Sequence, residues 1–404
     1  MTDTHRPRPS RRSFLAGAAA AGVVAGTGFS PTRFAIGGQA PVKVGILLPY
    51  SGTYASLGQA ITDGMKLRIE QAGRTLGGRP VEYIAIDSEA SPPQAPQHTK
   101  KLVTKDQVDF LVGPVHSGVA LAMSKVVSGR DSPLMIIPNA GANALTRDLC
   151  APNIFRASFS NWQTGYPGGK VMADDGHKTI VTMTWKYAAG NEIMDAGAEL
   201  FKQLGGTVIK DIRVPFPDVA FQAHLSEIAA LKPDAVFSFF SGGGAVKFVK
   251  DYASAGLKDS IPLYGPGFLT EGLTEAQGAA AEGIKSTLHY ARTLDNPANA
   301  AFLEAFQKAY GRDADVFAVQ GFDTGSLLLR ATAATEGDTG AGAKMIEVLS
   351  GAEVPDSPRG PWRMSKAHNP VMDIYLRQVE DGVNRILGVA AKNLADPATG
   401  CALG

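Results

Sequence analysis

The sequence lacks both the long apolar runs of a membrane protein and the charge excess of a nucleic-acid-binding protein. Beyond residue 29, no segment approaches the ~18 uninterrupted apolar residues that a membrane-spanning helix needs. Lys and Arg together number 39 and Asp and Glu number 38, so the formal net charge is only +1. We therefore expect no nucleic-acid partner and no attraction to a membrane surface.

The common signatures of catalysis are missing as well. The sequence contains no Gly-x-Ser-x-Gly motif of a hydrolase, and its seven histidines include no His-Glu-x-x-His pair for zinc. The glycine-rich stretch that starts at Ser241 lacks the Gly-Lys-Ser/Thr ending of a phosphate-binding loop. His116 is the best candidate for a general base, but a lone histidine in a loop more often serves in hydrogen bonding. We therefore expect a binding protein and not an enzyme, without cofactor or metal.

Cysteine is scarce, with only Cys150 and Cys401 in the whole chain. Two distant cysteines cannot form a zinc site of the Cys-x-x-Cys type. In an oxidising compartment they either pair or stay apart. A Cys150–Cys401 disulfide would tie the C-terminal tail to the body, and the alternative is two unrelated thiols.

The N-terminus does contain one clear signal. Ser10-Arg11-Arg12-Ser13-Phe14-Leu15 precedes a mildly apolar stretch of Ala, Gly, Val, Thr and Phe over residues 16–29. A paired arginine before such a stretch predicts a twin-arginine export signal within residues 1–40. The alternative is a basic arm, which would not need the apolar stretch. We expect export to the periplasm, with the mature chain starting between about residues 30 and 42.

The mature chain alternates short β-rich runs with longer helical ones, in two successive series. A length of about 360 residues exceeds what one hydrophobic core usually supports, which favours two domains. The strands are unbroken apolar runs and helices connect them, so each series predicts a doubly wound α/β domain with a parallel sheet. In the first series we predict strands at 42–48, 81–86, 109–112 and 134–137, and helices at 57–72, 96–104 and 118–127. In the second we predict strands at 179–183, 207–214, 235–240 and 262–264, and helices at 191–204, 221–230 and 246–255. Helices at 298–310, 317–335 and 343–349 follow, and then β-like runs at 360–364, 371–377 and 385–389.

Ligands of parallel α/β sheets bind beyond the carboxyl ends of the strands, where the loops open the next helices. Several of these loops are rich in small residues, hydroxyls and aromatics. Helix N-termini in such loops favour a carboxylate. The Ser117 hydroxyl could donate one hydrogen bond to it and the Gly141 N–H another. The alternative for each loop is ordinary turn chemistry, which also uses Gly, Ser and Asn.

Several motifs resemble type I periplasmic solute-binding proteins, the branched-chain amino acid receptor family of ABC importers, in their order along residues 42–389. They are Val42-Lys43-Val44-Gly45-Ile46-Leu47-Leu48 with Ser51-Gly52 and Leu57-Gly58, Phe110-Leu111-Val112-Gly113-Pro114, Pro133-Leu134-Met135-Ile136-Ile137-Pro138, Asn153-Ile154-Phe155-Arg156, Ala255-Gly256-Leu257 and Tyr264-Gly265-Pro266-Gly267. The resemblance implies two α/β lobes joined by a three-crossing hinge, with crossings near residues 158–161, 288–290 and 362–365. The expected lobes are residues 41–160 with 289–363, and residues 161–288 with 364–404.

The resemblance also implies a ligand site. In amino acid binders of this family, the positions matching Ser117, Asn139 and Gly141 hold the carboxylate, and an acid after a Gly-Pro pairs with the ammonium group. Here Gly267 occupies that place, and an unpartnered ammonium in a closed cleft would cost several kcal/mol. Residues 138–146 and 159–163 look like the subgroup that binds aromatic carboxylates. Phe239 and Phe240 would face opposite sides of a strand, and we favour Phe240 for the cleft. The expected ligand-binding residues are Tyr54, Leu57, His116, Ser117, Asn139, Ala140, Gly141, Tyr187, Phe240 and Phe268.

The expected function is therefore a receptor, most simply a monomer, that closes on a small organic acid and delivers it to the ABC permease of the inner membrane. The expected ligand is aromatic, of the benzoate, hydroxybenzoate or phenylpropanoid type. Two alternatives stay open: a receptor for branched-chain or other hydrophobic amino acids, and a sensory module that presents its closed form to a membrane receptor.

Overall fold

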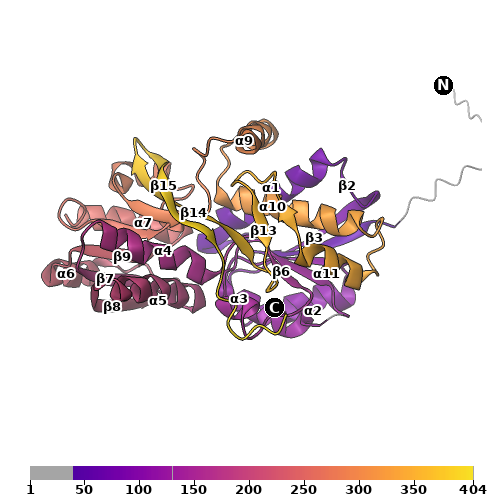
Figure 1. The fold of residues 1–404 in the computed structure, drawn as a ribbon, viewed down its shortest axis with the longest axis horizontal. Coiled ribbons are helices and arrows are strands. Elements are labelled where there is room, and N and C mark those ends of the chain that lie inside the picture. Colours follow the sequence, from indigo (N-terminus) through magenta and orange to yellow (C-terminus); the bar gives the residue numbers. More distant parts are fainter. Residues whose placement is uncertain (1–39, 130, 404) are drawn as a thin grey trace, which may run out of the picture. The chain divides into compact units, whose positions relative to one another are not determined.

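The computed structural model describes residues 40–129 and 131–403. The predicted export signal at Ser10 to Phe29 lies outside these described residues. The described chain alternates helices and strands and forms two β-sheets, some of whose strands are labelled in Figure 1. This is the mixed α/β architecture that the alternating pattern predicts. Within the described residues, none of the helices combines the length and the apolar character that crossing a membrane requires.

The first sheet has six strands in the order β2-β3-β1-β4-β5-β6, with all neighbours parallel except β2 and β3. Its central strands are apolar except for Lys43, because both faces of the sheet are covered by helices. The strands are β1 (Val42–Leu48), β2 (Thr75–Leu76), β3 (Arg79–Asp87), β4 (Phe110–Val112), β5 (Leu134–Ile137) and β6 (Ile154–Arg156). Its helices are α1 (Ala55–Gln71), α2 (Ala95–Lys100), α3 (Ser117–Val127), α9 (Pro297–Tyr310), α10 (Val316–Ala333) and α11 (Gly342–Ser350). We call these elements the first lobe.

Helices α1 and α10 pack unusually close together within the first lobe. A Cβ placed on Gly64 of α1 would lie 1.9 Å from the carbonyl oxygen of Ala318, and one on Gly321 of α10 would lie 2.0 Å from that of Ile61. Only glycine allows the two backbones to approach this far. The N-terminal turns of both helices are thereby held at a fixed spacing, and both reach the cavity described below.

The second sheet runs in the order β12-β13-β14-β11-β10-β9-β7-β8, with β15 also paired to β14. Its strands are β7 (Thr179–Lys186), β8 (Thr207–Pro215), β9 (Ala235–Phe239), β10 (Leu263–Pro266), β11 (Lys285–Leu288), β12 (Glu353–Val354), β13 (Trp362–Met364), β14 (Pro370–Glu380) and β15 (Val383–Leu394). Its helices are α4 (Asn161–Asp174), α5 (Ala188–Gln203), α6 (Gln222–Leu231), α7 (Gly242–Ser254) and α8 (Thr274–Gln277). We call β7 to β11, the paired parts of β14 and β15, and these helices the second lobe.

The chain passes between the lobes at four places within the described residues. The first two lie between β6 and α4 and between β11 and α9, near the expected crossings. The third is β14, whose first residues pair with β13 while its later residues pair with β11. The crossing expected near residues 362–365 thus lies further along the chain, because Trp362 still contacts Asp323 of the first lobe. The long ribbon of β14 and β15 was predicted only as two short β-like runs.

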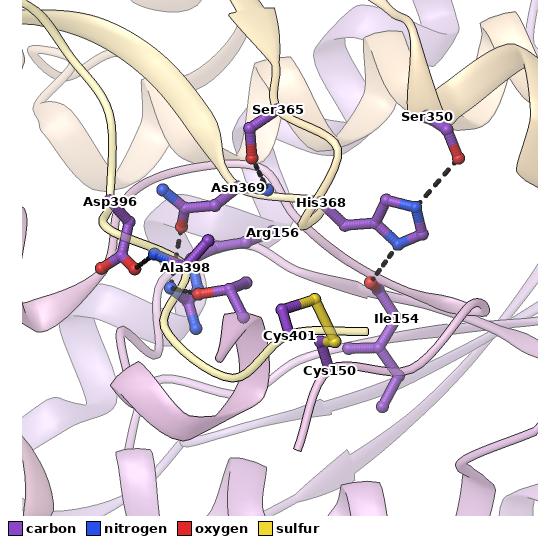
Figure 2. Close-up of a disulfide and its surroundings, with 11 residues drawn as sticks. Cys150, Ile154, Arg156, Ser350, Ser365, His368, Asn369, Asp396, Ala398 and Cys401 are labelled. Carbon is purple, nitrogen blue, oxygen red and sulfur yellow. Dashed lines mark hydrogen bonds between the residues drawn. A yellow bond between two sulfur atoms is a disulfide. The ribbon is translucent and has the colours of Figure 1, made fainter. Parts of the chain in front are cut away.

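The fourth crossing brings the C-terminal tail back to the first lobe, which differs from the expected placement of residues 364–404. Figure 2 shows Cys401 joined to Cys150 by a disulfide, with the two Cα atoms 5.5 Å apart. Asp396 accepts two hydrogen bonds from Arg147, at 3.1 and 3.0 Å. Of the two alternatives that the sequence left open, the structure therefore has the paired cysteines.

Candidate functional site

A cavity lies between the two lobes, at the carboxyl ends of the parallel strands, where the fold favours ligand binding. The first lobe contributes Tyr54, Leu57, Val115, Ser117, Asn139, Gly141 and Phe317. The second lobe contributes Asn161, Tyr187, Ala189, Ile193, Phe239, Ser241 and Phe268, and Phe159 comes from the first crossing.

One end of the cavity is built from uncharged polar groups. Ser117 is the first residue of α3, so its hydroxyl stands beside the partially positive N-terminus of that helix. The Asn161 side-chain amide donates to the Ser117 hydroxyl oxygen at 3.3 Å. Gly141 lies against the same amide, since a Cβ there would be 2.3 Å from Asn161 Oδ1. The three residues therefore form one compact polar end whose donors can hold a carboxylate.

Asn139 lines the same cavity and is oriented from behind. Its side-chain amide donates to Gln320 Oε1 at 2.8 Å. Gln320 Nε2 in turn lies 3.4 Å from Nε2 of the buried His289. Burial lowers the pKa of His289 well below its ordinary value, and nearby Arg359 and Arg377 lower it further. A neutral His289 keeps this chain of side chains free of charge at neutral pH.

The rest of the lining is aromatic. The rings of Phe159 and Phe268 have centroids 5.0 Å apart, and Phe268 lies 6.0 Å from Phe317 and 6.2 Å from Phe239. Such spacings allow tilted and edge-to-face contacts, which a flat aromatic ligand can join. The lining residues, all in the described part of the chain, include no Asp, Glu, Lys, Arg or His.

Several contacts join the lobes around the cavity. The hydroxyls of Tyr54 and Tyr187 lie 2.9 Å apart, and the Gly244 N–H donates to Thr53 Oγ1 at 3.2 Å. Burial raises the pKa of both tyrosines, so both hydroxyls keep their protons. The structure is thus a closed arrangement in which the second lobe covers the first.

Two glutamates of the second lobe extend this closure by accepting backbone N–H groups of the first. Glu192 of α5 accepts the Asn143 N–H at 2.9 Å and the Asn161 amide at 2.7 Å. Burial raises the pKa of Glu192, against the opposing effect of these hydrogen bonds. Glu271 accepts the Val316 N–H at 2.9 Å and pairs with buried Arg377 at 2.5 Å. Both carboxylates are engaged by the protein itself, and neither lines the cavity.

Seven of the ten expected ligand-binding residues line the cavity: Tyr54, Leu57, Ser117, Asn139, Gly141, Tyr187 and Phe268. His116, Ala140 and Phe240 do not. Ala140 is fully buried in the first lobe. His116 caps α3 through Nδ1, which accepts the Gly118 N–H at 3.1 Å, and its ring stacks on Tyr187 at 4.5 Å. Burial lowers the pKa of His116 to about 4.

The choice of Phe240 over Phe239 was wrong. The two rings do face opposite sides, but Phe239 lines the cavity while Phe240 is buried among Trp185, Phe221 and Phe248, at 4.6 to 5.0 Å. The expected set also omitted the lining residues Phe159, Asn161 and Phe317, as well as Val115, Ala189, Ile193 and Ser241. The first two lie in the stretch that resembles the aromatic-acid subgroup, so that motif could have identified them. Phe317 opens a helix and gave no such signal.

Comparison with known proteins identifies the family to which this chain belongs. The pattern of the family described as "Periplasmic binding protein" matches residues 41–384. This chain belongs to the periplasmic binding protein family. A curated relative of this periplasmic binding protein is the "Leu/Ile/Val-binding protein homolog 6" of Brucella melitensis, 32% identical over 345 residues, which are 84% of this chain and 87% of the relative.

Solved structures of periplasmic binding proteins match the whole fold. A solute-binding protein of an ABC transporter from R. palustris, in complex with benzoate, is 50% identical with a TM-score of 0.88. The match covers 90% of this chain and all of that one. A solute-binding protein from Rhodopseudomonas palustris BisB5, in complex with 3,4-dihydroxybenzoic acid, is 31% identical with a TM-score of 0.83 and covers 88% of this chain and 99% of that one. The two lobes therefore follow the type I periplasmic binding protein fold.

Proposed function

We propose that this protein is the periplasmic receptor of an ABC importer and that it binds a small aromatic carboxylate of the benzoate type. The observation that carries the proposal is the composition of the cavity between the lobes. Its polar end offers hydroxyl, amide and backbone N–H groups near a helix N-terminus, which match a carboxylate. Its remaining lining is mainly aromatic, which matches a ring.

An amino acid ligand fits this cavity less well, although curated relatives are named as Leu/Ile/Val-binding protein homologs. An ammonium group needs a carboxylate or several acceptors when it is buried. Gly267 stands at the position that the family resemblance assigns to that carboxylate. The nearby Glu192 and Glu271 are held by partners of their own. The solved relative with 50% identity contains benzoate, which supports an acid without an ammonium group.

The closed arrangement supports a role in delivery. A receptor that closes around its ligand presents the same surface of both lobes only when it is loaded, so a permease can recognise the loaded form. The paired arginine at Arg11-Arg12 supports export through the twin-arginine route. Fractionation of cells that express the full chain checks the location, and a protein found only in the cytoplasm would contradict it.

Isothermal titration calorimetry of the purified mature chain tests the proposed ligand. Benzoate and 4-hydroxybenzoate are expected to bind, and leucine is expected not to bind measurably. Two controls separate the parts of the ligand: benzamide lacks the charge, and cyclohexanecarboxylate keeps the carboxylate but has no flat ring. Both are expected to bind more weakly than benzoate, by about tenfold or more. Tight leucine binding without benzoate binding would overturn the proposed ligand.

A further inference from the structure

A second, larger hollow adjoins the cavity through shared lining residues. It opens to solvent and is also lined by both lobes. The cavity and this outer hollow share only two lining residues, Leu57 and Phe317. Both side chains are nearly fully buried, with 3% and 2% of their surface exposed. Leu57 and Phe317 are thus the side chains that the two spaces have in common, and we call this pair the partition.

The partition stands on a rigid support. Leu57 lies in the first turns of α1 and Phe317 in the first turn of α10, the two helices whose backbones meet at Gly64 and Gly321. On the other side, the ring of Phe268 stacks on Phe317 with centroids 6.0 Å apart. Because the backbones are fixed by close packing, a shortened side chain at Phe317 leaves space that the helices cannot easily fill.

The polar end belongs to the cavity alone. Its residues Ser117, Asn139, Gly141 and Asn161 line the cavity but not the outer hollow. A ligand held there by its carboxylate therefore directs its other end away from the polar groups. The outer hollow is lined by four acids, Glu271, Glu275, Asp313 and Asp315, and by two arginines, Arg292 and Arg312. The arginines already pair with Asp313 and with Asp63 of the first lobe. An uncharged extension suits this hollow better than a second carboxylate.

We propose that Leu57 and Phe317 are specificity-determining residues that limit the ligand to the length of a single benzoate-type ring. This inference rests on the proposed function and sharpens it from aromatic carboxylates in general to short ones. Aromatic acids with a tail opposite the carboxylate are excluded because the tail meets the partition. Removing the partition joins the two spaces and admits uncharged tails.

The test compares benzoate with 4-butylbenzoate, which has the same carboxylate and ring and an uncharged tail. Calorimetry gives the ratio of the two dissociation constants for each protein. Wild type is expected to bind benzoate more tightly by at least about tenfold. Phe317→Ala is expected to shift the ratio toward 4-butylbenzoate by at least about tenfold, and Leu57→Ala to shift it in the same direction by less. Adding a carboxylate to the end of the butyl tail is expected to abolish the gain.

Phe239→Ala is the matched control, because Phe239 lines the cavity but not the outer hollow. It removes a ring of the same size and is expected to weaken both ligands together, leaving the ratio within about threefold of wild type. If Phe317→Ala does not fold by circular dichroism, Phe317→Leu and Leu57→Ala provide the same comparison with smaller changes. A ratio that moves no more in these variants than in Phe239→Ala overturns the partition. If wild type binds neither ligand, the proposed function has failed and the partition fails with it, so the two failures are distinguished by the wild-type titration.

Discussion

The two lobes contribute different chemistry to the same cavity. The first lobe supplies Ser117, Asn139 and the backbone at Gly141, all close to the N-terminus of α3. The second lobe supplies mainly rings and aliphatic groups, among them Tyr187, Phe239 and Phe268, while its Asn161 completes the polar end. The difference indicates an order of events. An open first lobe can hold a carboxylate through preformed donors, and the second lobe then gains apolar burial only by closing over the ring.

The largest expected effect comes from the aromatic wall of the second lobe. Phe239→Ala is expected to raise the dissociation constant for benzoate roughly 30- to 150-fold, because losing one ring contact costs about 2–3 kcal/mol. Phe240→Ala is the adjacent control, because that ring packs in the core. It is expected to lower the free energy of unfolding by about 3–5 kcal/mol and to leave the dissociation constant within about threefold. Calorimetry measures the dissociation constant and urea denaturation the free energy of unfolding. If the two substitutions weakened benzoate binding equally, the assignment of Phe239 to the cavity wall would be contradicted.

A smaller effect is expected from pH, through His116 of the first lobe. Burial lowers the pKa of His116 from 6.5 to about 4, so the unfolded chain binds its proton more readily than the folded chain does. Stability from this group is therefore present above pH 6.5 and is lost as the pH falls toward 4. Between pH 8 and pH 5 the loss is expected to be about 2 kcal/mol.

His116→Asn provides the measurement of this effect. Asparagine keeps an acceptor at the N-cap of α3 but does not titrate in this range. The free energy of unfolding of the variant is expected to fall less steeply between pH 8 and pH 5, while its absolute value also reflects the lost stacking on Tyr187. Identical slopes for wild type and variant would show that His116 does not carry the effect.

The smallest expected effect comes from removing one serine hydroxyl from either lobe and comparing the losses in benzoate affinity. Ser117→Ala is expected to weaken benzoate binding by about 1–2 kcal/mol, the usual cost of one hydrogen bond to a charged group. Ser241→Ala, on the second lobe, is expected to have an effect below about 0.5 kcal/mol, because Ser241 lies on the wall dominated by rings. Calorimetry on both variants decides the point. A larger loss for Ser241→Ala would reverse the proposed division between the lobes.

Much of the fold could be predicted because buried parallel strands are unbroken apolar runs. The predicted strands at 42–48 and 134–137 coincide with β1 and β5, and the predicted helix at 118–127 differs from α3 by one residue. The loops after these strands were correctly placed beside the cavity for the same reason, since the carboxyl ends of parallel strands meet at one edge. Ser117 and Gly141 follow directly from that geometry.

The remaining features depend on contacts between distant segments, which leave no periodic signal. Phe317 reaches the cavity because α10 packs against α1, more than 200 residues away along the chain. Alternation along a strand shows that Phe239 and Phe240 face opposite sides, but it cannot show which side faces the second lobe's core. The course of the tail was missed because β14 and β15 form a ribbon that runs out and back.

The attachment of that tail has a practical consequence for observing the protein at work. With Cys401 bonded to Cys150, the chain end travels with the sheet that contains β5 and β6. A fluorescent dye at exposed Ala402 would move with the first lobe, and a second dye at exposed Gln203, the last residue of α5, would move with the second lobe. Energy transfer between the two dyes would therefore report the distance between the lobes. In a reducing buffer the disulfide opens, and the tail is then held to the first lobe only by noncovalent contacts such as the Arg147–Asp396 ion pair.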